Sequence, residues 1–474
     1  MSTSLMIDKT QNFLMTHGWR RIFRNIVFIS ALLLTLCAGE ALWLARIGWT
    51  LMALLYVVDS RYAIYAIFFY FAWFHSAGFL PKLIFTLKHF HLAIFLAFLA
   101  SLLKNSSFGI IKLGLRSGRR LLYVAAIIFL GFVNGLRFGA LDQAVRTPAN
   151  LSLILTGLLF IMGLMEHWGQ ENPRILFTKC IHFYIFSVCV HVGLGFFNAL
   201  EPQRAYLDLH LLHNNHIGIL CAFSLFYPLS LFFTTQSKLA RLLYFLSSVI
   251  IFSGLVSSCS RTAWLSCAAG AVLFFVLVAR VRHITFKNIL LRCGGPVFLM
   301  GAILLVLIAL FNHPVYERVK GLPQLLDLEY WRYTLHDSNN FGFLGKFRLE
   351  QFFTLNNILS KHLILGRGFI RKVVDFHGFY FCLLGATGIV GLGLYMNFCR
   401  LVLKDLLNSL QSYPPLDMLK IGSLCAFVVW LCTSFTESYF VQFSAWLNPL
   451  MILMLVRFQP QLKKNSKTVQ HART

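Results

Sequence analysis

The chain has 474 residues, of which 58% are hydrophobic and only 12% are charged, a balance that excludes an ordinary soluble domain of this size. Its formal net charge of +25 would indicate nucleic-acid binding in a soluble protein. In a membrane protein, basic residues gather in short cytoplasmic loops and contact anionic headgroups, so we expect membrane lipids and no nucleic acid as partners. The eleven cysteines include no C-x-x-C pair and support neither a zinc site nor a redox motif.

Repeated apolar runs of about 17–25 residues match the length that a helix needs to cross the hydrocarbon layer. They are continuous rather than alternating, which favours helices over a β-barrel. Residues 26–103 contain either two or four such runs. Ten more lie near 121–138, 151–168, 176–198, 214–234, 241–258, 262–279, 289–311, 377–401, 417–437 and 440–457. The sequence therefore predicts an all-α transmembrane bundle of twelve or fourteen spans.

The distribution of basic residues predicts the topology. Residues 1–24 and 104–120 are both basic, so both should face the cytoplasm. Because arginines precede the first apolar run and no clear small-residue cleavage site follows, we expect no cleavable signal peptide. We expect a bundle in two parts, 1–311 and 377–474, with a cytoplasmic tail and with one large outer loop, 312–376, between the parts. Parity places these loops outside: 139–150, 199–213, 258–261, 312–376 and 437–440.

The outer loop 312–376 is basic, which runs against the usual bias toward basic residues inside. An anionic ligand is the simplest reason, although a folded cap with a mixed surface is the alternative, since long loops translocate largely regardless of charge. The nine basic residues are Arg318, Lys320, Arg332, Lys346, Arg348, Lys361, Arg367, Arg371 and Lys372. The six acidic residues are Glu317, Asp327, Glu329, Asp337, Glu350 and Asp375.

The end of this loop carries the most informative pattern. Arg348 opens a helix-like segment, a Gly-Arg-Gly turn at 366–368 closes it, and His377 then begins a glycine-rich apolar span. An arginine and a histidine at the membrane surface indicate an enzyme that acts on an anionic, lipid-linked substrate. Histidine exchanges a proton near neutral pH, which suits a general base, whereas the alternative is an ordinary polar anchor at the interface.

A second group surrounds Arg261, which stands between two apolar spans that nearly touch at the outer face. Ionisable groups at such places are costly and are usually functional. The small residues Ser257, Ser258 and Ser260 allow close helix packing and leave room for a headgroup. The alternative is an arginine whose guanidinium reaches outward to lipid phosphates.

Two smaller features could contribute to a site. Asn215 and His216 enter the span at 214 and could orient a sugar or a phosphate, although helix capping by Asn214 or Asn215 is an equally good explanation. Glu437 lies near the outer end of the penultimate span and could pair with an arginine. The sequence has no aspartate pair for Mg²⁺ beside a diphosphate and no glycine-rich nucleotide loop, so we expect neither a metal nor another cofactor.

Three motifs in this order resemble the O-antigen ligase and polymerase superfamily of bacterial membrane glycosyltransferases. They are Ser258-x-Ser260-Arg261, Arg348 upstream of Leu365-Gly366-Arg367-Gly368, and His377-Gly378-Phe379-Tyr380 leading to Gly388 and Gly391. The resemblance covers roughly residues 200–440, and the asparagine entry at 214–216 also fits it. The chain departs from the family in having His-Gly where the family often has His-Asn.

The resemblance implies a GT-C-like enzyme of the inner membrane whose active site faces the periplasm. The donor would be a glycan on undecaprenyl diphosphate. The acceptor would be the lipid A core for a ligase or another lipid-linked glycan for a polymerase. His377, Arg348 and Arg261 would be catalytic. Substrate contacts would come from Asn215, His216, Arg367, Arg371, Tyr380 and Glu437.

Two other functions remain as alternatives. A protein O-oligosaccharyltransferase is disfavoured because no added periplasmic domain follows the last span. A transporter or flippase for lipid-linked glycans calls for charged residues along a pathway in mid-span. In this sequence the charges gather at the ends of spans and in one outer loop, which favours the enzyme.

Overall fold

The chain forms a bundle of helices in the computed structural model. The described residues are 22–36, 42–70, 89–103, 107–138, 141–169, 173–199, 214–258, 260–282, 345–369, 378–409 and 414–435. The short pieces 299–300, 302–303, 306 and 452–453 are also described. Helices and short turns make up these ranges, and no strand occurs within them. Within these described ranges seven helices are long and apolar enough to cross a membrane, so the protein is a helical membrane protein.

The seven long helices coincide in position with seven of the predicted spans. They are Arg119–Phe138, Thr147–Trp168, Ile175–Gly195, Ile217–Thr234, Lys238–Ser257, Arg261–Arg280 and Phe379–Asn408. Helix α19 (Pro414–Thr433) lies where the span 417–437 is predicted. The predicted spans 289–311 and 440–457 fall outside the described residues apart from their short pieces. The total of twelve or fourteen spans stays a prediction.

Within the first hundred residues the described part of the chain forms four helices. They are Ile22–Leu36, α2 (Leu42–Val58), α3 (Arg61–Tyr70) and α4 (His89–Leu103). The turn from α2 to α3 is fixed by Arg61, whose guanidinium lies 2.8 Å from the carboxylate of Asp59. Burial alone would raise the pKa of Asp59, but the hydrogen bonds and positive charge of Arg61 outweigh it and lower that pKa.

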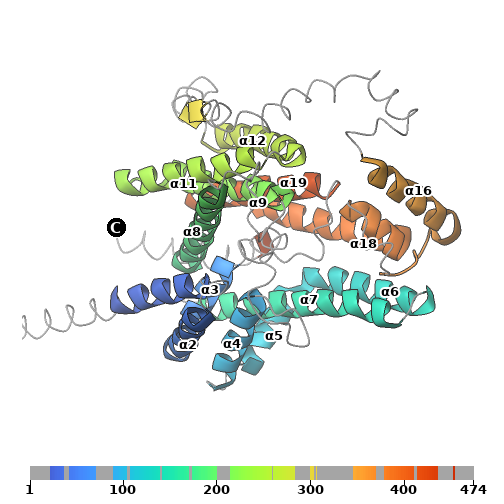
Figure 1. The fold of residues 1–474 in the computed structure, drawn as a ribbon, viewed down its shortest axis with the longest axis horizontal. Helices are drawn as coiled ribbons and strands as arrows, with labels where there is room; N and C mark the ends of the chain where they lie inside the picture. The colour runs from blue at the N-terminus through green and yellow to red at the C-terminus, as the bar shows by residue number, and fades with distance from the viewer. Residues whose placement is uncertain are drawn as a thin grey trace, which may run out of the picture.

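The helices that follow have these bounds. They are α5 (Ser107–Ser117), η2 (Arg119–Leu121), α6 (Leu122–Phe138), α7 (Leu141–Gly169), α8 (Pro173–Ala199), α9 (Asn214–Ser224), α10 (Phe226–Thr234), α11 (Lys238–Ser257), α12 (Arg261–Arg282), α16 (Gly345–His362) and α18 (Phe379–Ser409). Figure 1 shows α6, α7 and α18 running side by side, with α11, α12 and α19 along another side of the bundle. Helix α16 lies beside α18 at one end of the molecule.

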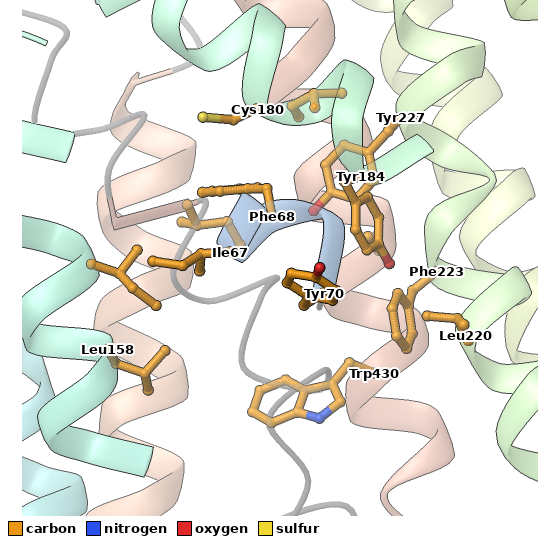
Figure 2. Packing of buried hydrophobic residues seen from close by; sticks show 14 of the residues in the cluster. Ile67, Phe68, Tyr70, Leu158, Cys180, Tyr184, Leu220, Phe223, Tyr227 and Trp430 are labelled. Carbon is orange, nitrogen blue, oxygen red and sulfur yellow. The ribbon is translucent and has the colours of Figure 1, made fainter. Parts of the chain in front are cut away.

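Buried aromatic side chains fill the centre where α3, α8, α10 and α19 meet. Figure 2 shows Tyr70, Tyr184, Tyr227 and Trp430 gathered there, and all four are at most 1% exposed. The hydroxyl of Tyr70 lies 2.5 Å from that of Thr35, and Tyr184 shares a hydrogen bond with Ser224. These bonds satisfy polar groups that would otherwise be costly to bury in apolar surroundings.

Helix α18 is not the single straight span that the apolar run 377–401 predicts. Gly388 interrupts it with φ 64° and ψ −163°. The rings of Phe379 and Tyr395 lie 4.8 Å apart, whereas sixteen residues of straight helix would separate them by about 24 Å. The short half Phe379–Thr387 therefore folds back against the start of the long half, Ile389–Ser409. Hydropathy does not register this reversal, because both halves are equally apolar.

Candidate functional site

The Ser-x-Ser-Arg motif forms the tight connection between α11 and α12. Ser260 is the N-cap of α12, since its Oγ accepts a hydrogen bond from the backbone N–H of Ala263 at 3.4 Å. The indole N–H of Trp264 donates to the carbonyl of Leu255 at 2.9 Å and ties the start of α12 to the last turn of α11. Arg261 is the first residue of α12 and is half-buried, with its Nε atom shielded from solvent. The predicted place of Arg261 between two adjoining spans is confirmed, and its place at the outer face stays a prediction.

The start of α9 lies directly against this connection. A Cβ atom at Gly218 would come within 2.4 Å of the Oγ of Ser258 and 2.9 Å of the Cβ of Ser260. Glycine is therefore needed for α9 to approach so closely. Asn215 and His216 belong to the first turn of α9, next to Gly218. The fold brings this turn and the Ser-x-Ser-Arg connection together, while the side chains of Asn215 and His216 are outside the described part of the structure.

Helix α16 and the turn after it follow the sequence prediction closely. Arg348 lies near the start of α16, which ends at His362, and the Gly-Arg-Gly turn comes next. The N–H of Gly366 donates to the carbonyl of His362 at 2.9 Å, and Gly366 and Gly368 both have positive φ, 69° and 88°. This is a glycine-dependent helix end. The side chain of Arg348 is outside the described residues.

After α16 the chain runs inward along α6. The ring of His362 lies 4.5 Å from that of Phe138, the last residue of α6. Further along, the N–H of Phe369 donates to the carbonyl of Gly131 at 3.3 Å. From Phe138 to Gly131 the helix rises by about 10 Å. The segment 363–369, which we call the inserted turn, therefore passes from the surface, where Leu363, Ile364 and Leu365 are exposed, into the bundle, where Gly366, Gly368 and Phe369 are buried.

The inserted turn satisfies the carbonyl groups at the end of the short half of α18. The N–H of Arg367 donates to the carbonyl of Gly385 at 2.8 Å, and the N–H of Gly368 donates to the carbonyl of Ala386 at 2.8 Å. The last carbonyls of a helix have no partner within the helix. In a membrane protein such groups must find partners in the protein itself. The backbone of the inserted turn supplies them.

The same turn also satisfies the N–H groups that begin the long half of α18. Ile389 donates to the carbonyl of Leu363 at 2.9 Å, and Val390 donates to the carbonyl of Ile364 at 3.2 Å. The break at Gly388 is therefore closed on both sides by one short segment from elsewhere in the chain. Irregular backbone inside a membrane protein is tolerated where protein surrounds it, and broken helices often border substrate sites.

Arg367 occupies the middle of the inserted turn. Its side chain is half-buried, and its Nε atom is fully buried with no hydrogen-bond partner among the described residues. A buried donor on a cation is costly unless a partner meets it. The backbone of Arg367 is bonded to the broken helix and its neighbour Gly368 lies against Gly135, so this cation belongs to the place where α6, α18 and the inserted turn meet.

The start of α18 is fixed to the end of α19. The N–H of Phe379 donates to the carbonyl of Ser434 at 2.8 Å, and a Cβ at Gly378 would lie 2.6 Å from the carbonyl oxygen of Phe435. The hydroxyl of Tyr380 donates to the carbonyl of Leu431 at 3.0 Å, which gives this side chain a partner within the bundle. His377 precedes Gly378 in the sequence but, like Arg371 and Glu437, lies outside the described residues.

Helix α19 joins the two groups. It packs against α9 and α12 on one side, and its end receives the start of α18. The fold therefore brings the Arg261 connection and the α18 region to neighbouring helices of one bundle (Figure 1). The convergence of Arg261 and Arg348 on His377 stays a prediction, because it depends on side chains that are not described.

Helix α6 contributes to this region in a way that the motifs in the sequence do not predict. Asn134 is 5% exposed, and its amide donates a hydrogen bond to the carbonyl of Leu365. Gly131 and Gly135 lie on the same face; a Cβ at Gly131 would meet the ring of Phe369, and a Cβ at Gly368 would meet the backbone of Gly135. A signal was present, because a lone asparagine between two glycines in an apolar run is costly without a partner.

Comparison with models of known protein families gives no match to this chain, and comparison with curated proteins gives no significant match either.

Proposed function

We propose that this chain is an O-antigen ligase-like glycosyltransferase. It transfers a glycan from undecaprenyl diphosphate to the lipid A core at the periplasmic face of the bacterial inner membrane. The observation that carries the proposal is Arg367, a half-buried cation with a buried, unpartnered Nε atom beside the break in α18, where α6 ends. A lipid-linked diphosphate is an anion that reaches such a place from within the membrane.

The proposed reaction displaces the lipid diphosphate from the sugar. The acceptor hydroxyl oxygen attacks the anomeric carbon, and the bond from that carbon to the diphosphate oxygen breaks with its electron pair. The hydroxyl proton passes to His377, which acts as general base. Negative charge grows on the departing diphosphate, and planar guanidinium groups stabilise it through paired hydrogen bonds. Arg261 and Arg348 take this role, and Arg367 binds the donor.

The break in α18 supports a site at this place. Discontinuous helices in membrane proteins turn backbone groups and helix ends toward a binding site. In the sequence His377 stands two residues before Phe379, the first residue of the broken helix, and the inserted turn that closes the break carries Arg367. The residues proposed for the base and for donor binding thus belong to two segments joined by hydrogen bonds.

The decisive experiment is the glycan pattern of a strain that lacks this chain. A ligase predicts loss of all long-chain lipopolysaccharide on gels while lipid-linked polymer accumulates. A polymerase of the same superfamily predicts lipopolysaccharide that carries a single repeat. Purified protein with a lipid-linked donor and lipid A core should then release undecaprenyl diphosphate. Unchanged lipopolysaccharide and no release of lipid diphosphate would contradict both functions.

A further inference from the structure

Helix α6 presents one small face to the inserted turn. Residues at positions i, i+3 and i+4 share a face of a helix, and Gly131, Asn134 and Gly135 have this spacing. Gly131 accepts a hydrogen bond from Phe369, Asn134 donates one to the carbonyl of Leu365, and Gly135 lies against Gly368. All three contacts meet the segment that contains Arg367.

Of these three residues of α6, Asn134 is the one that meets the inserted turn with its side chain. The two glycines contribute backbone and space, whereas the amide of Asn134 reaches across to a carbonyl two residues before Arg367. Asn134 is buried within an apolar helix, where an amide is retained at a cost that its hydrogen bond offsets. A side chain that only packed α6 against its neighbours would be better replaced by an apolar one.

We propose that Asn134 is a positioning residue, which holds Arg367 in place by binding the carbonyl of Leu365. This inference rests on the proposed function, because Arg367 is taken to bind the donor diphosphate. Loss of the amide frees the inserted turn to shift, and Arg367 then meets the diphosphate in more than one arrangement. The effect falls on donor affinity, while the acceptor hydroxyl and His377 react as before once the donor is bound.

The first test is a double-mutant cycle on purified protein with the lipid-linked glycan donor. Asn134→Ala should raise the KM for donor by about three- to tenfold, the range of one lost hydrogen bond, with kcat little changed. In an Arg367→Ala background the same substitution should have almost no further effect, since the group that it positions is gone. Asn134→Gln keeps an amide donor and should recover part of the loss. Equal effects of Asn134→Ala in both backgrounds would overturn the proposal.

The second test does not depend on activity. Hydrogen–deuterium exchange reports on the amides of Arg367, Gly368, Ile389 and Val390, which are all hydrogen-bonded across the inserted turn. These amides should exchange faster in Asn134→Ala. The matched control is Asn397→Ala on α18, where the asparagine binds Arg400 at 2.8 Å and should leave that exchange unchanged.

The two tests separate failure of this inference from failure of the proposed function. If the wild-type chain neither binds nor transfers the lipid-linked donor, the proposed function fails together with the catalytic consequence of Asn134. Faster exchange in Asn134→Ala would still support the hold on the inserted turn. Unchanged exchange at 363–369 would overturn the hold, whatever the activity of the protein.

Discussion

The backbones of Gly366, in the inserted turn, and Gly388, at the break in α18, lie directly against each other. A Cβ at Gly366 would lie 2.6 Å from the backbone nitrogen of Gly388, and a Cβ at Gly388 would lie 2.6 Å from that of Leu365. Both residues have positive φ, 69° and 64°. Each glycine therefore serves its own backbone conformation and also makes room for the other segment.

Substitution of either glycine should destabilise the protein. Positive φ alone costs an alanine about 1–2 kcal/mol, and the overlap with backbone atoms adds to that cost. Gly366→Ala and Gly388→Ala should each lower the melting temperature in detergent. Gly393→Ala is the matched control on α18, because its added Cβ meets nothing within 4 Å. There alanine should be neutral or should stabilise by up to about 1 kcal/mol. Equal melting temperatures in all three variants would contradict the interlocked geometry.

The arginines proposed to stabilise the departing diphosphate should not tolerate lysine. Arg261→Lys and Arg348→Lys keep the charge but lose the planar pair of donors. We expect sharply reduced glycan transfer with normal expression, measured in membranes that contain equal amounts of protein. Arg400→Lys, at an exposed position where the arginine side chain donates to the amide oxygen of Asn397, is the control and should transfer normally. Full activity of both lysine and alanine variants at 261 and 348 would exclude this role.

His377 should be needed for turnover and not for donor binding. General-base catalysis by a positioned side chain contributes about 10²–10⁴-fold. His377→Ala should lower kcat by that factor while donor affinity, which depends on the arginines, persists. His377→Gln should not restore turnover, because an amide can donate a hydrogen bond but does not take up the proton. Near-normal turnover of the glutamine variant would leave His377 with an orienting role only.

The two ends of the bundle should face opposite sides of the membrane. Ser360 lies on α16, within the loop 312–376 that parity places outside, and Ser237 caps α11 in a loop that parity places inside. In a background without native cysteines, Ser360→Cys should react with an impermeant thiol reagent in intact spheroplasts. Ser338→Cys, in the same outer loop, should behave in the same way. Ser237→Cys should react only after lysis, and the reverse pattern would invert the topology.

Transfer should not require a divalent metal, because arginines replace the cation at the diphosphate in the proposed mechanism. The sequence has no aspartate pair of the kind that holds Mg²⁺ beside a diphosphate, and the six acidic residues of the outer loop are scattered among nine basic ones. Activity of the purified protein with its lipid-linked donor should therefore persist in EDTA. Loss of activity with the chelator and recovery with Mg²⁺ or Mn²⁺ would contradict the role given to the arginines.

The sequence predicts those features that depend on local composition. Apolar length locates the helices, and the Gly-Arg-Gly pattern correctly places the end of α16 before Gly366. The reversal at Gly388 could not be predicted from the sequence. It depends on carbonyl and N–H groups of residues 363–368, and a hydropathy profile does not show that these residues contact α18. The role of Asn134 was missed for the same reason, since its partner Leu365 lies 231 residues away in the chain.

The contact between the inserted turn and α18, which we call the seam, is made by main-chain hydrogen bonds. Four backbone hydrogen bonds join residues 363, 364, 367 and 368 to residues 385, 386, 389 and 390. Most side chains along this seam can change without altering those bonds. The spacing cannot, because adding or removing one residue between Leu363 and Gly368 would misalign one pair of bonds whenever the other is kept. The number of residues between Leu363 and Gly368 is therefore a requirement of this part of the fold, alongside the glycines at 366 and 388.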